Sequence, residues 1–142
     1  MHHVAIMNTS WKLIPKILLG EKTIESRWYQ TKRAPWDKAK AGDTIFFKNT
    51  GEPVSARARV TAVRQFELEG VEDVRRIIQK YGDDICLVNK NPKTWGKLPK
   101  YCILMRLERP TRIAKAFTIN KKGFGSGVAW ITVKNVRAIK KR

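Results

Sequence analysis

The sequence predicts an α+β domain: a small mixed, or mostly antiparallel, barrel-like β-sheet of about six strands, with two or more helices around it. Three observations carry this prediction. The 142 residues suffice for one hydrophobic core, residues 54–62 alternate with period two, and strand-like segments outnumber helical ones without strict alternation. No repeat or linker-like stretch divides the chain, so residues 1–142 are predicted to form one domain.

The first half of the chain is expected to contain three strands and one helix. Residues 4–7 form a short apolar run typical of a strand, and a helix follows with Ser10 as its N-cap. Trp11 is the first apolar position of that helix, and Gly20 is expected to end it. Residues 23–29 and 44–49 are rich in β-branched and aromatic side chains, which favours strands.

The second half begins with the clearest patterns in the chain. From Val54 onward, apolar residues alternate with polar ones, which places Arg57 and Arg59 on one solvated face of a strand. Residues 71–81 place their apolar side chains on one face of a helix, which Gly82 is expected to end. Strands are predicted near residues 101–107 and 128–136, on either side of a segment rich in lysine and glycine.

The charge of the chain indicates a polyanionic partner. Thirty Lys and Arg residues against 12 Asp and Glu residues give a formal net charge of +18. Residues 1–84 carry 15 basic and 11 acidic residues, whereas residues 85–142 carry 15 basic residues and one acid. Such asymmetry favours a surface that contacts phosphates, so RNA is the expected partner and DNA the alternative. A solvated basic face is the structural alternative.

Other classes of protein find little support in the composition. No apolar run approaches the length of a membrane span, no signal-peptide pattern opens the chain, and no helix pattern suits a membrane surface. Cys86 and Cys102 make neither a disulfide framework nor a zinc site. We therefore expect a cytoplasmic protein with no metal and no cofactor, while the sequence leaves its oligomeric state open.

The segment from Gly20 to Arg27 is the densest candidate site. A helix stop at Gly20 puts Lys22 at a helix–strand junction, where a side chain can face a cleft. If residues 24–29 are extended, Glu25 and Arg27 point to the same face. Lys22 would then be oriented for contact with a phosphate or a base. The same spacing also fits an ordinary ion-pair cluster at the surface.

The motif Gly20-x-Lys22-x-x-Glu25-x-Arg27, followed by Gly42-Asp43 before a strand, resembles the signature of ASCH domains. These domains belong to the PUA-like superfamily of small mixed pseudo-barrels, and the resemblance covers residues 3–63. It implies an RNA-binding domain in which the motif lines a cleft. It also allows an enzyme, since some members hydrolyse the amide of N4-acetylcytidine and others are ribonucleases.

A catalytic function would depend on Lys22, with Glu25 as its companion. The amidohydrolase group uses a lysine, a threonine and a glutamate; Lys22 matches the lysine, but Glu25 stands where that group has its threonine. The two histidines, His2 and His3, are adjacent at the N-terminus, so a two-histidine ribonuclease mechanism has no obvious pair.

Cations and aromatic rings alternate beyond the motif, as binding of single-stranded nucleic acid requires. Tryptophans in such a segment can also be core anchors. The glycine-rich stretch 123–127 lacks a following helix, which disfavours a dinucleotide or Walker site. The predicted nucleic-acid-binding residues are Lys22, Arg27, Tyr29, Lys32, Arg33, Trp36, Arg57, Arg59, Lys121, Lys122, Phe124 and Ser126.

Three functions therefore follow from the sequence. The first is an RNA-binding module that uses the motif cleft and the basic surface. The second is a hydrolase acting on RNA or on a modified nucleoside, with Lys22 as its central group. The third is a protein-interaction module for an acidic partner.

Overall fold

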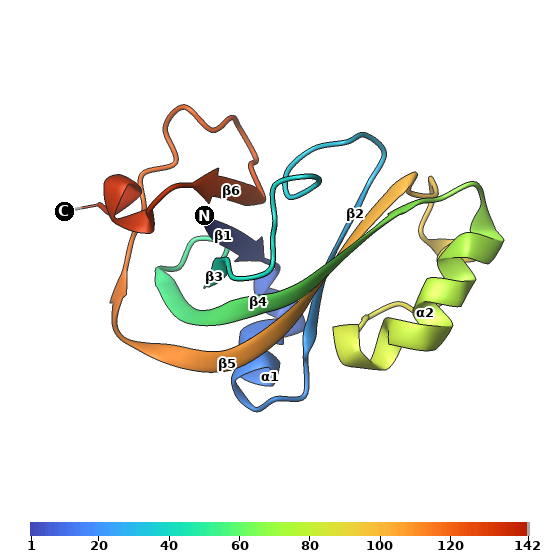
Figure 1. The fold of residues 1–142 in the computed structure, drawn as a ribbon, viewed down its shortest axis with the longest axis horizontal. Helices are drawn as coiled ribbons and strands as arrows, with labels where there is room; N and C mark the ends of the chain where they lie inside the picture. Colours follow the sequence, from blue (N-terminus) through green and yellow to red (C-terminus); the bar gives the residue numbers. More distant parts are fainter. Residues whose placement is uncertain (142) are drawn as a thin grey trace.

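Six strands form one mixed sheet in the computed structural model, which describes residues 1–141 (Figure 1). The strand order is β2-β5-β4-β3-β1-β6; β1 and β3 pair in parallel, and every other neighbouring pair is antiparallel. The elements are β1 (His2–Met7), a 3-10 helix (Thr9–Trp11), α1 (Leu13–Leu18), β2 (Ile24–Tyr29), β3 (Thr44–Asn49), β4 (Val54–Glu67), α2 (Val71–Ile85), a 3-10 helix (Pro92–Thr94), β5 (Tyr101–Phe117), β6 (Trp130–Val133) and a final 3-10 helix (Val136–Ile139). The predicted small α+β pseudo-barrel is confirmed.

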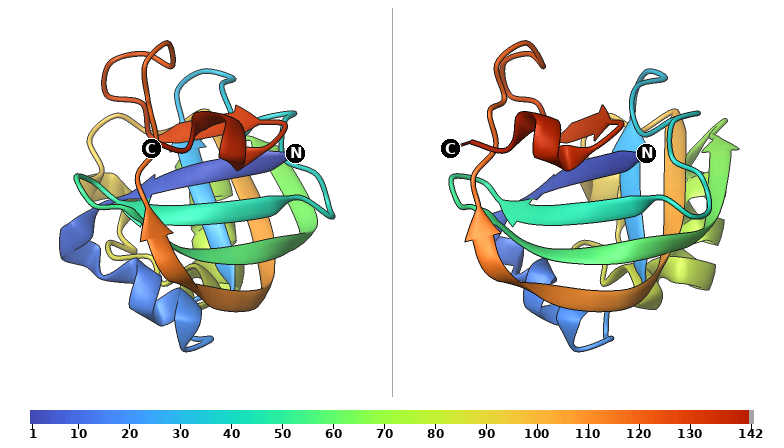
Figure 2. Two further views of the ribbon diagram at one scale, coloured as in Figure 1. Left: turned by 90° about the vertical axis from the view of Figure 1, so that its left-hand side faces the viewer. Right: turned by 60° about the vertical axis from the view of Figure 1, so that its left-hand side comes forward.

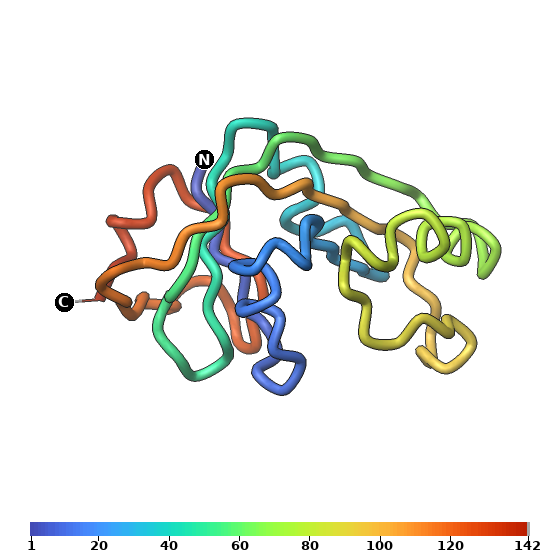
Figure 3. Tube along the Cα trace, turned by 90° about the horizontal axis from the view of Figure 1, so that it is seen from below, coloured from blue at the N-terminus to red at the C-terminus, as the bar shows by residue number. Residues whose placement is uncertain are grey.

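The two longest strands, β4 and β5, join the two ends of the molecule. They contain 14 and 17 residues and pair along most of their length, with three irregularities in register. The ribbon that they form extends from the region of α2 to the end where β1, β3 and β6 lie (Figures 1 and 3). A bulged ribbon bends and twists strongly, which lets one sheet curl around a core.

Three clusters of buried side chains fill the molecule. The largest packs α1 against the inner face of the sheet, around Ile17 and Phe47. A second lies beneath α2, whose Val74 and Ile77 pack against Leu104 of β5. A third joins β1, β3 and β6 to the C-terminal segment. The second cluster fixes the C-terminal end of α2 near β2.

Arg27 closes the gap between the two edges of the sheet. Its Nη1 donates to the carbonyl of Ala129, just before β6, at 3.1 Å, and its Nη2 donates to the carbonyl of Ile6 on β1 at 3.3 Å. The guanidinium also lies over the ring of Trp130, 5.1 Å from its centroid. One side chain from edge strand β2 thus performs part of the role that strand pairing performs in a closed barrel.

The predicted first helix is broken in two. Lys12 adopts a left-handed conformation, with φ of 53°, and separates the 3-10 turn from α1. The N-cap of the 3-10 helix is Asn8 and not Ser10. The side chain of Asn8 accepts hydrogen bonds from both the backbone N–H and the hydroxyl of Ser10. As a consequence, Trp11 leaves the apolar helix face predicted for it and is 47% exposed.

Helix α2 and strand β5 are longer than predicted. Gly82 does not end α2, which continues to Ile85, and Cys86 takes the left-handed position after it, with φ of 56°. The burial of Ile85 in the second cluster accounts for this extra turn. Strand β5 continues to Phe117 because β4 provides a pairing partner for its polar second half. Strand β6, in contrast, is shorter than the predicted 128–136.

His3 is a buried structural residue. Trp130 Nε1 donates to His3 Nδ1 at 3.2 Å, so Nε2 carries the proton and donates to Asp43 Oδ2 at 2.7 Å. Burial lowers the pKa of His3, although the hydrogen bond to Asp43 opposes this effect. Burial alone would raise the pKa of Asp43, but hydrogen bonds from His3 and from the backbone N–H of Lys40 lower it overall. The motif residue Asp43 therefore supports the fold.

Acidification is expected to destabilise the protein through His3. The unfolded chain binds a proton with the ordinary histidine pKa of about 6.5, whereas folded His3 has a lower pKa. The unfolded state therefore binds more protons, so the free energy of unfolding falls from about pH 7 to about pH 5. Urea denaturation across this range checks it. His3→Gln should flatten the slope without abolishing it, because the pKa of His2 is also lowered; an unchanged slope would contradict the assignment.

Candidate functional site

A cavity of about 550 Å³ lies beside the outer edge of β2. Its other walls are the end of β1 with the 3-10 turn that follows, and the chain that leaves the C-terminus of α2. Three predicted motif residues line it, together with four large aromatic side chains. These residues are Lys22, Glu25 and Arg27, and Trp11, Trp28, Tyr29 and Trp95.

Lys22 connects the strand and the helix that border the cavity. Its ammonium donates to the carbonyl of Ile24 on β2 at 2.8 Å and to the carbonyl of Ile85 on α2 at 2.6 Å. The Nζ atom also lies 3.5 Å from Glu25 Oε1, and the residue is only 2% exposed. Two hydrogen bonds and one ion pair thus hold the end of the Lys22 side chain in place.

Glu25 lies between the two cations of the motif and is 3% exposed. Its Oε1 accepts a hydrogen bond from the backbone N–H of Ser26 at 2.9 Å. Its Oε2 lies 3.8 Å from Arg27 Nη2 but accepts no hydrogen bond from any group that the structure describes. The predicted cluster is therefore real and is buried in a cavity wall, unlike the surface ion pairs that its spacing also allowed.

Arg27 contributes its charge to the cavity but has few free donors. The same guanidinium that bonds to Ile6 and Ala129 also lies 3.5 Å from the sulfur of Met7. Only 13% of the side chain is exposed. These contacts give Arg27 a structural role.

Aromatic rings form the other walls. Trp28 and Trp95 meet edge to face, with centroids 5.1 Å apart, and Trp28 Nε1 donates to Ser26 Oγ at 3.0 Å. Tyr29 continues the wall toward the loop after β2, where the guanidinium of Arg33 lies 4.3 Å from its ring centroid. Trp11 is the most exposed of the rings. Sequence reasoning missed it because its helical spacing is typical of a core residue.

The loop between β2 and β3 holds three further predicted residues, and none of them lines the cavity. Trp36 packs edge to face on Tyr101, 5.1 Å between centroids, as a partly buried neighbour of the main core. Lys32 pairs with Glu67 at 3.3 Å, and Arg33 covers the outer side of Tyr29. This loop extends the cavity rim with positive charge.

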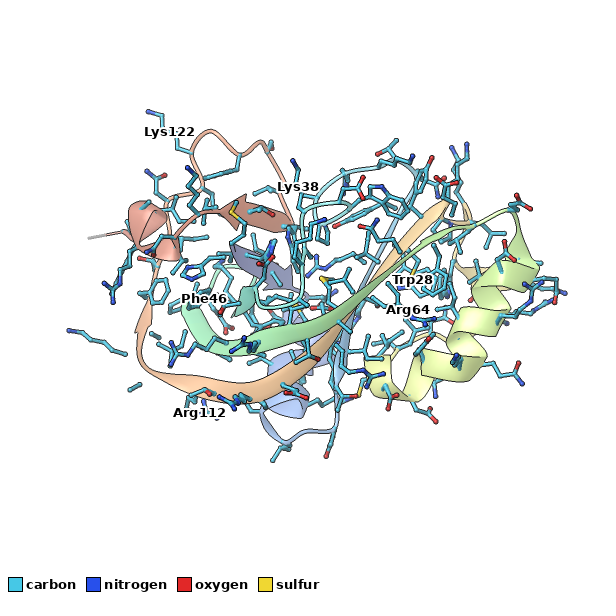
Figure 4. All side chains as sticks on the ribbon, viewed as in Figure 1. Trp28, Lys38, Phe46, Arg64, Arg112 and Lys122 are labelled. Carbon is cyan, nitrogen blue, oxygen red and sulfur yellow. The ribbon has the colours of Figure 1, made fainter. Side chains whose placement is uncertain are left out.

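The remaining predicted residues lie elsewhere on the surface. Arg57 and Arg59 are exposed on β4, and Lys121, Lys122 and Ser126 are exposed in the loop before β6. Phe124, from the same loop, packs against the third core cluster. Figure 4 shows Lys122 well separated from Trp28, which lies beside α2. The structure therefore does not gather the predicted residues into one surface.

The part of the chain that the structure describes holds neither a metal-binding cluster nor a membrane-spanning helix. Residues 1–141 contain no group of three or more His, Cys, Asp or Glu side chains placed to hold a metal ion. No described helix combines the length and the apolar character that crossing a membrane requires.

The fold matches that of ASCH proteins. A crystal structure of the ASCH protein from Zymomonas mobilis superposes with a TM-score of 0.68 and 15% sequence identity, covering 99% of this chain and 96% of that one. Two single-residue variants of the same protein, a Tyr-to-Phe and a Ser-to-Ala variant, each give a TM-score of 0.69 at 16% and 17% identity, covering 96% of this chain and 93% and 91% of theirs. No family model and no curated protein matched the sequence. The ASCH-like resemblance is confirmed as a resemblance of fold.

Replacing Lys22 by Met should destabilise the protein strongly. The substitution leaves two buried carbonyls without a donor and Glu25 without its nearer cation, and breaking a buried ion pair in this way costs about 3–5 kcal/mol. Urea denaturation measures the loss. Lys38→Met, at an exposed lysine of the β2–β3 loop, is the matched control and should change stability by less than about 0.5 kcal/mol. A Lys22→Met variant as stable as this control would contradict the bridging role.

Proposed function

We propose that the chain binds single-stranded RNA and holds one unstacked base in the cavity beside β2. The observation that carries this proposal is the composition of the cavity, where buried motif charges and aromatic rings share one volume of about 550 Å³ that is partly open to solvent. That volume lies within the range typical of small-ligand sites. RNA-binding proteins commonly recognise single strands by combining ring stacking with polar contacts to base edges.

The aromatic walls support a planar ligand. Trp28 and Trp95 pack edge to face against each other, so the accessible ring of Trp11 offers the more open stacking surface. Stacking of a base on an aromatic side chain is worth about 1–3 kcal/mol and needs no particular sequence. In this arrangement an aromatic ring stacks on the face of a base, while the motif residues contact the edge of the base.

The charge of the chain supports a phosphate backbone outside the cavity. Arg33 lies over Tyr29, which connects the cavity wall to the basic β2–β3 loop. This loop and the loop with Lys121 and Lys122 rise on the same side of the sheet in the ribbon views (Figure 2). The resemblance of the motif to ASCH domains favours RNA over DNA as the bound nucleic acid.

The other two functions have less support. A hydrolase centred on Lys22 needs an amine that can accept a proton or attack a substrate, whereas this ammonium is directed at Ile24, Ile85 and Glu25. An acidic protein partner would account for the basic surface, but it gives no role to the aromatic cavity.

Binding of single-stranded RNA should depend strongly on salt. With several phosphate contacts, we expect affinity to fall at least about tenfold between about 50 and 200 mM salt. Fluorescence anisotropy of a labelled oligoribonucleotide measures it, with the DNA of the same sequence as comparison. Polyglutamate of equal charge should compete poorly; equal competition would favour the protein-interaction function, and a salt-independent affinity would contradict phosphate contacts.

Trp11→Ala should weaken RNA binding while leaving the fold intact. Loss of one stacking ring corresponds to about a 5- to 150-fold decrease in affinity. Trp11 is 47% exposed and belongs to none of the three core clusters, so the variant is expected to fold. Leu19→Ala is the matched control, because Leu19 is an exposed apolar residue of the same segment that does not line the cavity. Equal effects of both substitutions would argue against a base at Trp11.

A further inference from the structure

The carboxylate of Glu25 has one oxygen without a donor. Oε1 is held by the N–H of Ser26 and lies near Lys22, but Oε2 accepts no hydrogen bond from any described group. Glu25 lines the cavity and is only 3% exposed. A buried carboxylate oxygen without a hydrogen bond destabilises the protein, and a donor that reaches it offsets much of that loss in free energy.

The neighbouring cations do not supply that donor. The ammonium of Lys22 is directed at Ile24, Ile85 and Oε1. The guanidinium of Arg27 is held by the carbonyls of Ile6 and Ala129, which leaves its Nη2 at 3.8 Å from Oε2, beyond hydrogen-bond distance. A group with an N–H that reaches Oε2 can therefore bind without displacing a partner. Because Oε2 itself is covered, the side chains around it must shift to admit that group.

Resting on the proposed function, we infer that Glu25 makes the cavity selective for cytosine and adenine over uracil. In these two bases the exocyclic amino group adjoins a ring acceptor on the Watson–Crick edge. The exocyclic amino group donates to Glu25 Oε2, as carboxylates do when they read cytosine N4. Uracil presents carbonyl oxygens on both sides of its N3–H. The N3–H can also donate to Oε2, but the two carbonyl oxygens then approach the carboxylate and repel it, which weakens that hydrogen bond. Glu25 is thus the specificity-determining residue of the cavity.

The hydrogen bond from Ser26 makes this inference sharply testable. In Glu25→Gln, the amide carbonyl should take the position of Oε1, because only an acceptor can bond to the Ser26 N–H and lie near the Lys22 ammonium. The amide NH₂ then occupies the position of Oε2. An acceptor becomes a donor at one atom, and a uracil carbonyl becomes the better partner.

The experiment compares equal-length oligocytidylate, oligoadenylate and oligouridylate by fluorescence anisotropy at fixed salt. The wild-type protein should bind the cytosine and adenine oligomers at least about fivefold more tightly than the uracil oligomer. Glu25→Gln should bind the uracil oligomer best. Glu21→Gln is the matched control, since it removes the same charge from an exposed position of the same motif and should keep the wild-type order.

A second measurement uses the wild-type protein alone, so that the test does not depend on the folding of a variant. An oligomer of N4,N4-dimethylcytidine keeps the cytosine ring but lacks the amino N–H, and it should lose the preference over uracil. Equal binding of all oligomers would overturn the role of Glu25 while leaving RNA binding intact, as would an unchanged order in folded Glu25→Gln. Failure to bind any oligomer would overturn the proposed function itself.

Discussion

A buried ammonium group holds the border of the cavity in place. Strand β2 is an edge of the sheet, and its outward carbonyl groups have no neighbouring strand to pair with. Lys22 supplies a donor to one of them, at Ile24, and at the same time to the last turn of α2, at Ile85. Together with the backbone hydrogen bond from the Thr23 N–H to the carbonyl of Asp84, this ties the helix beside the start of the strand. The cavity lies next to this connection, between β2, the end of β1 and the chain that leaves α2.

Arg27 performs the complementary task on the same strand. Its guanidinium reaches across to β1 and to the residue before β6. Strand β2 is thus tied to the opposite edge of the sheet by Arg27, and its start is tied to α2 by Lys22. Glu25 balances the pair and is the acid closest to both. Burying three charges is expensive unless each is fully paired. Among the buried side-chain atoms of these three residues, Glu25 Oε2 is the one without a hydrogen-bond partner in the described structure. It belongs to a residue of the cavity wall.

Local patterns predicted much of this fold. The turn at Gly42-Asp43 and the strand-favouring side chains after it predict a strand over residues 44–49, and β3 spans Thr44–Asn49. The meeting of Glu25 and Arg27 also follows from spacing, since extended residues two apart share a face, and Lys22 lies at the helix–strand junction just before them. The burial of Lys22 did not follow, because it depends on a carbonyl 63 residues away. The exposure of Trp11 depends in the same way on an unforeseen break at Lys12.

The excess of basic residues and the cavity lie mostly in different parts of the chain. Half of the basic residues lie beyond residue 84, where acids are nearly absent, yet the cavity is built mostly from the near-neutral first half of the chain. Charges outside an enclosed site attract any polyanion and are screened by salt. Groups inside it, shielded from water, distinguish ligands by hydrogen-bond complementarity. Under the proposed function, salt should therefore change the affinity for RNA much more than the preference among bases, because Glu25 is buried in the cavity wall.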